Sequence, residues 1–270
     1  MIPKIIHYSW FSGEEMPVVY KLTMATWKSV LPDYEFRLWD AAALKEVNNT
    51  FANEAVSVRK WAFAADFIRV YAVYHYGGIW LDGDVVMVKS FDSFLNNRMF
   101  IGKEYDEKYV HGSGLGYFNG LTSHCFGAEP KHPFLKDCLS YYENRHFIVS
   151  DDCSLPQVLK YDMRLLPVVQ ALLAHKYGYS GFILDAEKEE ILREDIHVYP
   201  SFYFHAPKYH TLNEVYCVHN CFGGWLSGNE GKTSFELSVK PRKKDLFYYF
   251  FTICNKFLVK KRLQVRVKSF

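Results

Sequence analysis

A long apolar helix pattern, two glycines and an apolar strand pattern follow one another in this chain and constrain its fold most. Residues 59–76 are mostly apolar or aromatic, Gly77 and Gly78 come next, and IWLDGDVVMV follows at 79–88. Glycine adopts the positive φ angles that end helices, so the helix should end at this pair. A helix that is apolar on nearly every side is a buried one. We therefore expect a core helix that connects directly to a buried strand.

Two aspartates lie within this apolar strand pattern. Asp82 and Asp84 are one residue apart, and their side chains point to the same side if the segment stays extended. Two carboxylates a few ångströms apart repel each other, and a divalent cation turns the repulsion into chelation. Alone, a DXD triplet is a weak signal, since about one is expected by chance in such a chain. The apolar context favours a cation site over a solvated turn.

The helix pattern carries one polar stripe. The residues that share its face are Arg59, Ala62, Asp66 and Arg69. The spacing leaves two interpretations open. The stripe is a structural ion-pair ladder, or Asp66 and Arg69 point into the same cleft as Asp82 and hold hydroxyls and phosphate oxygens. The two roles can coexist.

Strand and helix patterns alternate along the first 90 residues. Strands are expected at 3–10, 34–40 and 79–88, and helices at 18–30, 41–47 and 59–76. Short links between alternating elements are typical of a mostly parallel sheet covered on both faces. Ligands of such sheets bind beyond the carboxyl ends of the strands, where Trp10 and Asp82 fall. We expect an α/β domain over residues 1–240 and a separate tail over 241–270.

Several segments resemble glycosyltransferase family 32 in order and spacing. They are IPKIIHYSWFSG, SVLPDYEFRLWD, WAFAADFIRVYAVYHYGGIWLDGDVVMVKSFD and HPFLKDCLSYYE, and the resemblance returns at VYCVHNCFGGW. The family comprises sugar transferases with a DXD motif, including bacterial capsular-polysaccharide enzymes and yeast mannosyltransferases. The resemblance implies a glycosyltransferase-A type, Rossmann-like fold.

The resemblance also implies a metal-dependent nucleotide-sugar site. The family's DXD motif holds Mn²⁺ or Mg²⁺ against the diphosphate of the donor. Asp84 is thus expected to bind the metal directly, and Asp82 to reach the donor's ribose or, through water, the metal. Trp10 matches the position where relatives stack the nucleobase. Asp66 and Arg69 match the helix positions that hold the donor sugar's hydroxyls.

The later part of the chain supplies further candidates. His219 and Trp225 fall where related enzymes place a late metal ligand and a residue near the leaving oxygen. Asp151, Asp152 and Gln157 either line the acceptor side or cap the helix after them. A carboxylate on that side would stabilise the positively charged sugar of the transition state. The expected catalytic set is therefore Asp82, Asp84, Asp152 and Trp225.

We expect a retaining hexosyltransferase that moves galactose or glucose from a UDP-sugar to a lipid-linked saccharide acceptor in polysaccharide biosynthesis. One alternative is a haloacid-dehalogenase-type phosphatase with Asp82 as nucleophile and Asp151 and Asp152 as its magnesium pair. That nucleophile ends the first strand of its fold, whereas several elements precede Asp82 here. A second alternative is a sugar-binding module without catalysis. Nucleic acid is not an expected partner.

The net charge of +2 is unevenly distributed. From Pro241 onward there are nine Lys or Arg and one acid, Asp245, so the first 240 residues sum to −6. Within this tail, 246–259 is apolar and aromatic and lies between basic clusters. It is too short to span a bilayer and suits a helix at the membrane surface; the alternative is a last helix packed on the domain. The first residues lack the features of a secretion signal. We expect a cytoplasmic protein, peripheral at the inner face of the membrane.

Overall fold

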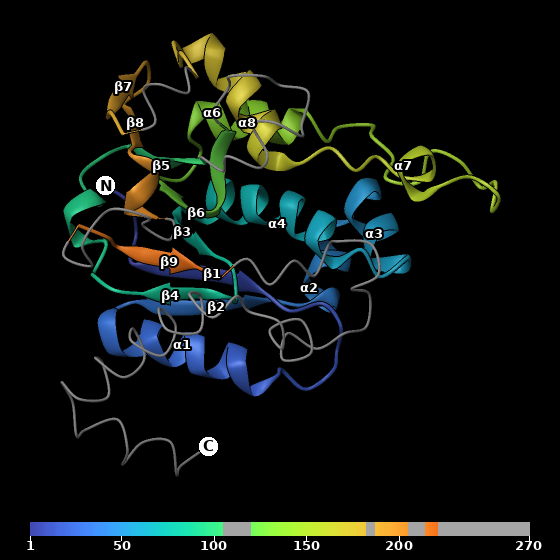
Figure 1. The fold of residues 1–270 in the computed structure, drawn as a ribbon, viewed down its shortest axis with the longest axis horizontal. Coiled ribbons are helices and arrows are strands. Elements are labelled where there is room, and N and C mark those ends of the chain that lie inside the picture. Colours follow the sequence, from blue (N-terminus) through green and yellow to red (C-terminus); the bar gives the residue numbers. More distant parts are fainter. Residues whose placement is uncertain (105–119, 182–186, 205–213, 221–270) are drawn as a thin grey trace, which may run out of the picture. The chain divides into compact units, whose positions relative to one another are not determined.

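The structure is a computed structural model that describes residues 1–104, 120–181, 187–204 and 214–220 (Figure 1). Trp225 and the basic tail lie outside these residues. No helix within the described ranges has the length and apolar character to cross a membrane.

A seven-stranded sheet forms the centre of the fold. Its order is β2 (Glu35–Trp39), β1 (Ile5–Ser9), β3 (Gly78–Leu81), β6 (Gly120–Ala128), β5 (Met99–Glu104), β8 (Ile196–Tyr199) and β7 (Glu190–Leu192). β1 runs parallel to β2 and β3, and β5 runs parallel to β8. β6 is antiparallel to both β3 and β5, and β7 to β8. All strands except β6 and β7 therefore share one direction, which confirms the mostly parallel α/β sheet.

Helices cover both faces of this sheet (Figure 1). α1 (Val18–Val30) covers one face, and α4 (Trp61–Tyr76), α6 (Pro133–Ser140) and α8 (Leu166–Ala174) cover the other. β3 shows how its residues are shared between the two layers. Ile79 and Leu81 pack in the cluster that contains Trp27 of α1, whereas Trp80 packs in the cluster that contains Phe63 of α4. A strand buried on both faces is apolar at every position, as this one is.

The link from β2 to β3 contains one more helix than the sequence predicted. Besides α2 (Ala41–Val47), it contains a further helix, α3 (Thr50–Ser57), which the sequence interpretation did not include. Arg59 lies in the turn before α4 with a φ of 59°, so the expectation that it belongs to the polar face of the helix is wrong. Asp66 and Arg69 do lie on α4. The helix ends as expected at Gly77 and Gly78, whose φ angles are 64° and 99°.

The expected single strand at 79–88 is also wrong. β3 ends at Leu81, and the chain then leaves the sheet. β4 (Val85–Met87) pairs instead with β9 (Cys217–His219) in a separate antiparallel ribbon. The elements after β6 that remain are the short α7 (Gln157–Lys160) and single-turn 3₁₀ segments.

Candidate metal centre and donor site

The turn between β3 and β4 carries both aspartates of the DXD motif. The peptide N–H of Asp82 donates to the carbonyl of His124 on β6 (3.0 Å), and the N–H of Val85 donates to the carbonyl of Asp82 (3.0 Å). The chain therefore turns between Asp82 and Asp84. The sequence interpretation assumed that strand alternation places both carboxylates on one side, and this is wrong. The turn brings them together.

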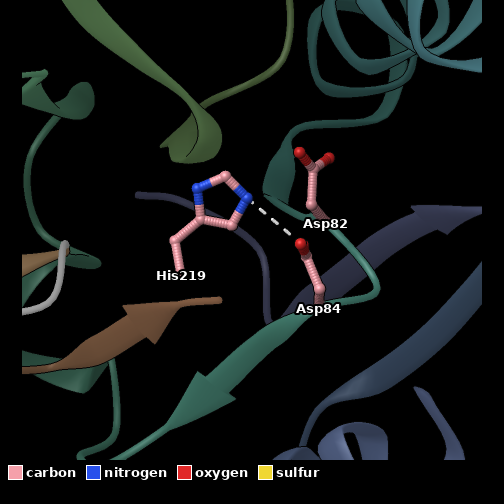
Figure 2. Close-up of side chains that lie close together, drawn as sticks. All are labelled: Asp82, Asp84 and His219. Atoms are coloured by element: carbon pink, nitrogen blue, oxygen red, sulfur yellow. Dashed lines mark ion pairs between the residues drawn. The ribbon is translucent and has the colours of Figure 1, made fainter. Parts of the chain in front are cut away.

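Three side chains converge at this turn (Figure 2). The ligand atoms of Asp82, Asp84 and His219 all lie within 4.8 Å of one another. Nε2 of His219 is 3.2 Å from Oδ1 of Asp84. These residues come from two segments more than 130 positions apart, and they are the three that the resemblance implied as metal ligands.

The β4–β9 ribbon places His219 beside Asp84. Val85 is opposite His219 in the strand register, so the imidazole lies next to the turn. Asn220, the residue after His219, also holds this strand end to the turn. Its backbone N–H (3.2 Å) and its Nδ2 (2.8 Å) both donate to the carbonyl of Asp84. The ring of His219 stacks on that of His124, with centroids 4.1 Å apart. Pairing, capping and stacking together restrict where the imidazole can lie.

This donor set fits a divalent cation. Asp84 is buried, and the side chains of Asp82 and His219 are mostly buried. Two neighbouring carboxylates in such a place are costly unless something positive lies between them. Carboxylate oxygens are ligands of Mg²⁺ and Mn²⁺, and imidazole is a ligand of transition metals, so the chemistry of the set suits a divalent cation. A cation held by these three side chains would keep coordination positions for oxygens of a bound molecule.

Arg69 connects α4 to the turn. Its guanidinium is buried, with Nη2 3.2 Å from Oδ1 of Asp66 and Nη1 3.4 Å from Oδ2 of Asp82. The other oxygen of Asp82 accepts from the indole N–H of Trp80 at 2.7 Å. Asp82 is thus held through both oxygens, whereas Asp84 faces His219. The Arg69–Asp66 contact is the part of the expected ion-pair ladder that forms, because Arg59 pairs with Glu14 instead. That Asp84 is the more direct metal ligand stays a prediction.

Two further carboxyl groups lie in the same electrostatic field. Burial raises the pKa of Asp66 to about 7, although the charge of Arg69 opposes the change. Burial likewise raises the pKa of Glu104, the last residue of β5, to about 7, with His219 and Arg69 opposing it. Sequence reasoning missed Glu104, because nothing in the local sequence distinguishes it from the neighbouring acids Asp106 and Glu107.

An aromatic pair borders the turn. Trp10 follows β1, and its ring meets Tyr20 of α1 edge-on, with centroids 5.3 Å apart. Burial, and then the charges of Asp84 and Asp82, raise the pKa of the Tyr20 hydroxyl. A Cβ on Gly83 would lie 2.9 Å from the ring of Tyr20, so glycine is what fits between the aspartates. Tyr20, also missed from sequence, links Trp10 to the metal centre.

Of the two remaining expected catalytic residues, Trp225 lies outside the described residues, and Asp152 is not part of this cluster. Asp152 is exposed, and its carboxylate accepts bonds from the backbone N–H (2.8 Å) and the hydroxyl (2.7 Å) of Ser154. It lies shortly before α7, which is far from β4 and β9 in Figure 1. The contacts of Asp152 are those of a turn cap, and its catalytic role stays a prediction.

Comparison with known proteins agrees with this site. Residues 17–101 match the family described as "Glycosyltransferase sugar-binding region containing DXD motif". The matched region includes α4 and both aspartates of the turn. This part of the chain is therefore similar to the DXD-containing sugar-binding region of glycosyltransferases, and the resemblance to glycosyltransferase family 32 is confirmed.

Curated relatives include two yeast enzymes. Inositol phosphoceramide mannosyltransferase 1 of Schizosaccharomyces pombe is 28% identical over 160 residues, which is 54% of this chain and 45% of that protein. Mannosyl phosphorylinositol ceramide synthase SUR1 of Saccharomyces cerevisiae is 29% identical over 159 residues, which is 55% of this chain and 37% of that protein. The matches therefore span less than half the length of these relatives.

Two solved glycosyltransferases show a distant likeness. The PaToxG glycosyltransferase has a TM-score of 0.43 and 16% identity, covering 65% of this chain and 69% of that one. The galactosyltransferase LgtC in complex with donor and acceptor sugar analogues has a TM-score of 0.35 and 10% identity, covering 89% and 98%.

Proposed function

We propose that the chain is a metal-dependent retaining glycosyltransferase that moves a hexose from a nucleoside-diphosphate sugar to a saccharide acceptor. The observation that supports this best is the convergence of Asp82, Asp84 and His219 within 4.8 Å of one another. They lie beyond the carboxyl end of β3, where α/β sheets bind ligands.

The chemistry explains why such a site needs these residues. The leaving group is a nucleoside diphosphate, and a bound Mn²⁺ or Mg²⁺ neutralises the charge that develops on it as the glycosidic bond breaks. Asp84 and His219 would hold that cation, and Trp80 and Arg69 fix the orientation of Asp82 beside it. Trp10 stacks the nucleobase, and Asp66 and Arg69 hold hydroxyls of the transferred sugar.

The identity of the hexose follows from two considerations. The resemblance to capsular-polysaccharide enzymes favours galactose or glucose carried by UDP. The yeast relatives are named as mannosyltransferases, which adds GDP-mannose as a donor. Both relatives are also named for a ceramide lipid, which supports a lipid-linked acceptor. We propose that the basic tail holds the protein at a membrane surface, where such an acceptor lies.

One assay separates this proposal from the two other classes. The purified chain is incubated with UDP-galactose, UDP-glucose, GDP-mannose and p-nitrophenyl phosphate, each with and without Mn²⁺. We expect slow release of free hexose from one nucleotide sugar, only when Mn²⁺ is present. Release of phosphate from the ester would favour the phosphatase with Asp82 as nucleophile. Tight binding of a nucleotide sugar without turnover would favour the sugar-binding module.

A further inference from the structure

Glu104 has a carboxylate oxygen that none of the described residues satisfies. It is the last residue of β5, and its Oε2 is buried with no hydrogen-bond partner among the described residues. A buried acceptor without a donor costs more than the average hydrogen bond contributes, so such groups in folded proteins call for an explanation. A bound ligand that donates a hydrogen bond is one such explanation.

The sheet places Glu104 at the same edge as the DXD turn. β6 lies between β3 and β5 and is antiparallel to both, so β3 and β5 end at the same edge. Asp82 follows β3, and Glu104 ends β5 opposite Gly120. The first turn of α8 covers this corner. A Cβ on Gly120 would lie 3.2 Å from Pro167, and the backbone N–H of Leu166 bonds to Asp66.

Within the described part of the chain, none of the charged groups near Glu104 donates a hydrogen bond to its Oε2. Those that act on its carboxyl are His219, Arg69, Asp82 and Asp66. The guanidinium of Arg69 contacts Asp66 and Asp82 and donates to the carbonyls of Ala65 and Ser123. Glu104 is also not one of the three residues whose ligand atoms lie within 4.8 Å of one another. It therefore lies beside the metal centre without belonging to it.

We propose that Glu104 is a specificity-determining residue of the donor site, whose free carboxylate oxygen accepts a hydrogen bond from a hydroxyl of the transferred hexose. A neutral sugar ring with several hydroxyls supplies hydrogen-bond donors to a site that already contains several acids, and it adds no further negative charge. A hydroxyl at the wrong ring position leaves Oε2 buried and unsatisfied, so the site rejects that epimer. The inference rests on the proposed function, since it names what holds the sugar of the same donor.

The test separates the sugar from the nucleotide. Calorimetry with Mn²⁺ compares the nucleotide sugar selected by the donor panel with its nucleoside diphosphate, UDP or GDP, in the wild type and in Glu104→Gln. We expect unchanged binding of the diphosphate and roughly tenfold to hundredfold weaker binding of the nucleotide sugar, the range for a hydrogen bond to a charged group. Deoxy analogues of the donor then identify the hydroxyl. The wild type should lose affinity for one of them, and Glu104→Gln should not distinguish it from the parent donor.

Two further variants make the result decisive. Glu194→Gln, which removes an acid paired with Arg98 in the turn before β8, is the matched control and should change neither affinity. Glu104→Asp shortens the side chain by one carbon and should also lose the sugar-dependent affinity. This variant provides the same test if Glu104→Gln does not fold. Full sugar-dependent affinity in both Glu104 variants would overturn the inference alone. A wild type that binds no nucleotide sugar would overturn it together with the proposed function.

Discussion

Asp84 is the single residue on which the proposed chemistry depends most. Its carboxylate lies 3.2 Å from His219, and Asn220 holds its backbone carbonyl. Asp84→Asn keeps the side-chain shape, removes one ligand charge and relieves the repulsion with Asp82. We expect nearly complete loss of hexose release at saturating Mn²⁺, with an unchanged or higher melting temperature. Activity above about 5% of wild type would remove Asp84 from the metal set.

Trp10 is the residue that tests nucleobase stacking. Its ring borders the turn through Tyr20, so it is placed to cover a base next to the metal. Base–aromatic stacking contributes about 1–3 kcal/mol, so Trp10→Ala should raise the KM of the donor by about one to two orders of magnitude. Trp61→Ala, at the start of α4, is a matched control. If KM is unchanged in Trp10→Ala and only the melting temperature falls, Trp10 serves the core instead.

At the scale of elements, a buried histidine joins the start of the sheet to the end of α4. Nε2–H of His7 on β1 donates to the carbonyl of Gly77 (2.8 Å), and Nδ1 accepts from the indole N–H of Trp39 on β2 (3.1 Å). These bonds require the neutral ring. Burial lowers the pKa of His7 to about 4, despite the bond to Gly77 that opposes it.

This histidine should make the fold sensitive to acid. Because the folded pKa lies below the unfolded value of 6.5, its contribution is complete above about pH 6.5 and is lost as the pH falls toward about 4. Urea unfolding of the wild type and of His7→Gln, at about pH 7 and about pH 4.5, measures the difference. We expect the wild type to lose about 2–3 kcal/mol more than the variant over this interval. Parallel losses in the two proteins would show that His7 does not carry the effect.

Local sequence patterns predicted the elements whose structure is determined by residues close in the sequence. The apolar run of α4 and the glycines after it were sufficient to predict that helix and its end, and Asp66 and Arg69 followed from its spacing. The break after Leu81 was not predictable, because Val85 to Met87 has the same apolar character whether it continues in the sheet or pairs with Cys217 to His219. Tyr20 and Glu104 were missed for a related reason, since only tertiary packing brings them to the turn.

At the scale of the whole molecule, the acidic domain and the basic tail should have different partners. The tail at 241–270 lies outside the described residues, and its sequence alternates basic clusters with an apolar, aromatic segment. Each base near an anionic surface contributes about 1 kcal/mol. Truncation after Lys240 should move the protein from the membrane to the soluble fraction and reduce transfer to a lipid-linked acceptor, while donor hydrolysis continues. A full-length protein that does not sediment with anionic liposomes at low salt would assign the tail to the fold.

The metal centre is the central claim, and binding of Mn²⁺ itself tests it most directly. Electron paramagnetic resonance measures free Mn²⁺ in the presence of the wild type, His219→Ala and His175→Ala, each with and without UDP or GDP. His175 is exposed and serves as the matched control. We expect the wild type and His175→Ala to bind one Mn²⁺ each, more tightly with the nucleotide, and His219→Ala to bind it at least tenfold more weakly, as expected for loss of one of three protein ligands. Equal binding by His219→Ala and the wild type, or no binding by any of them, would contradict the account.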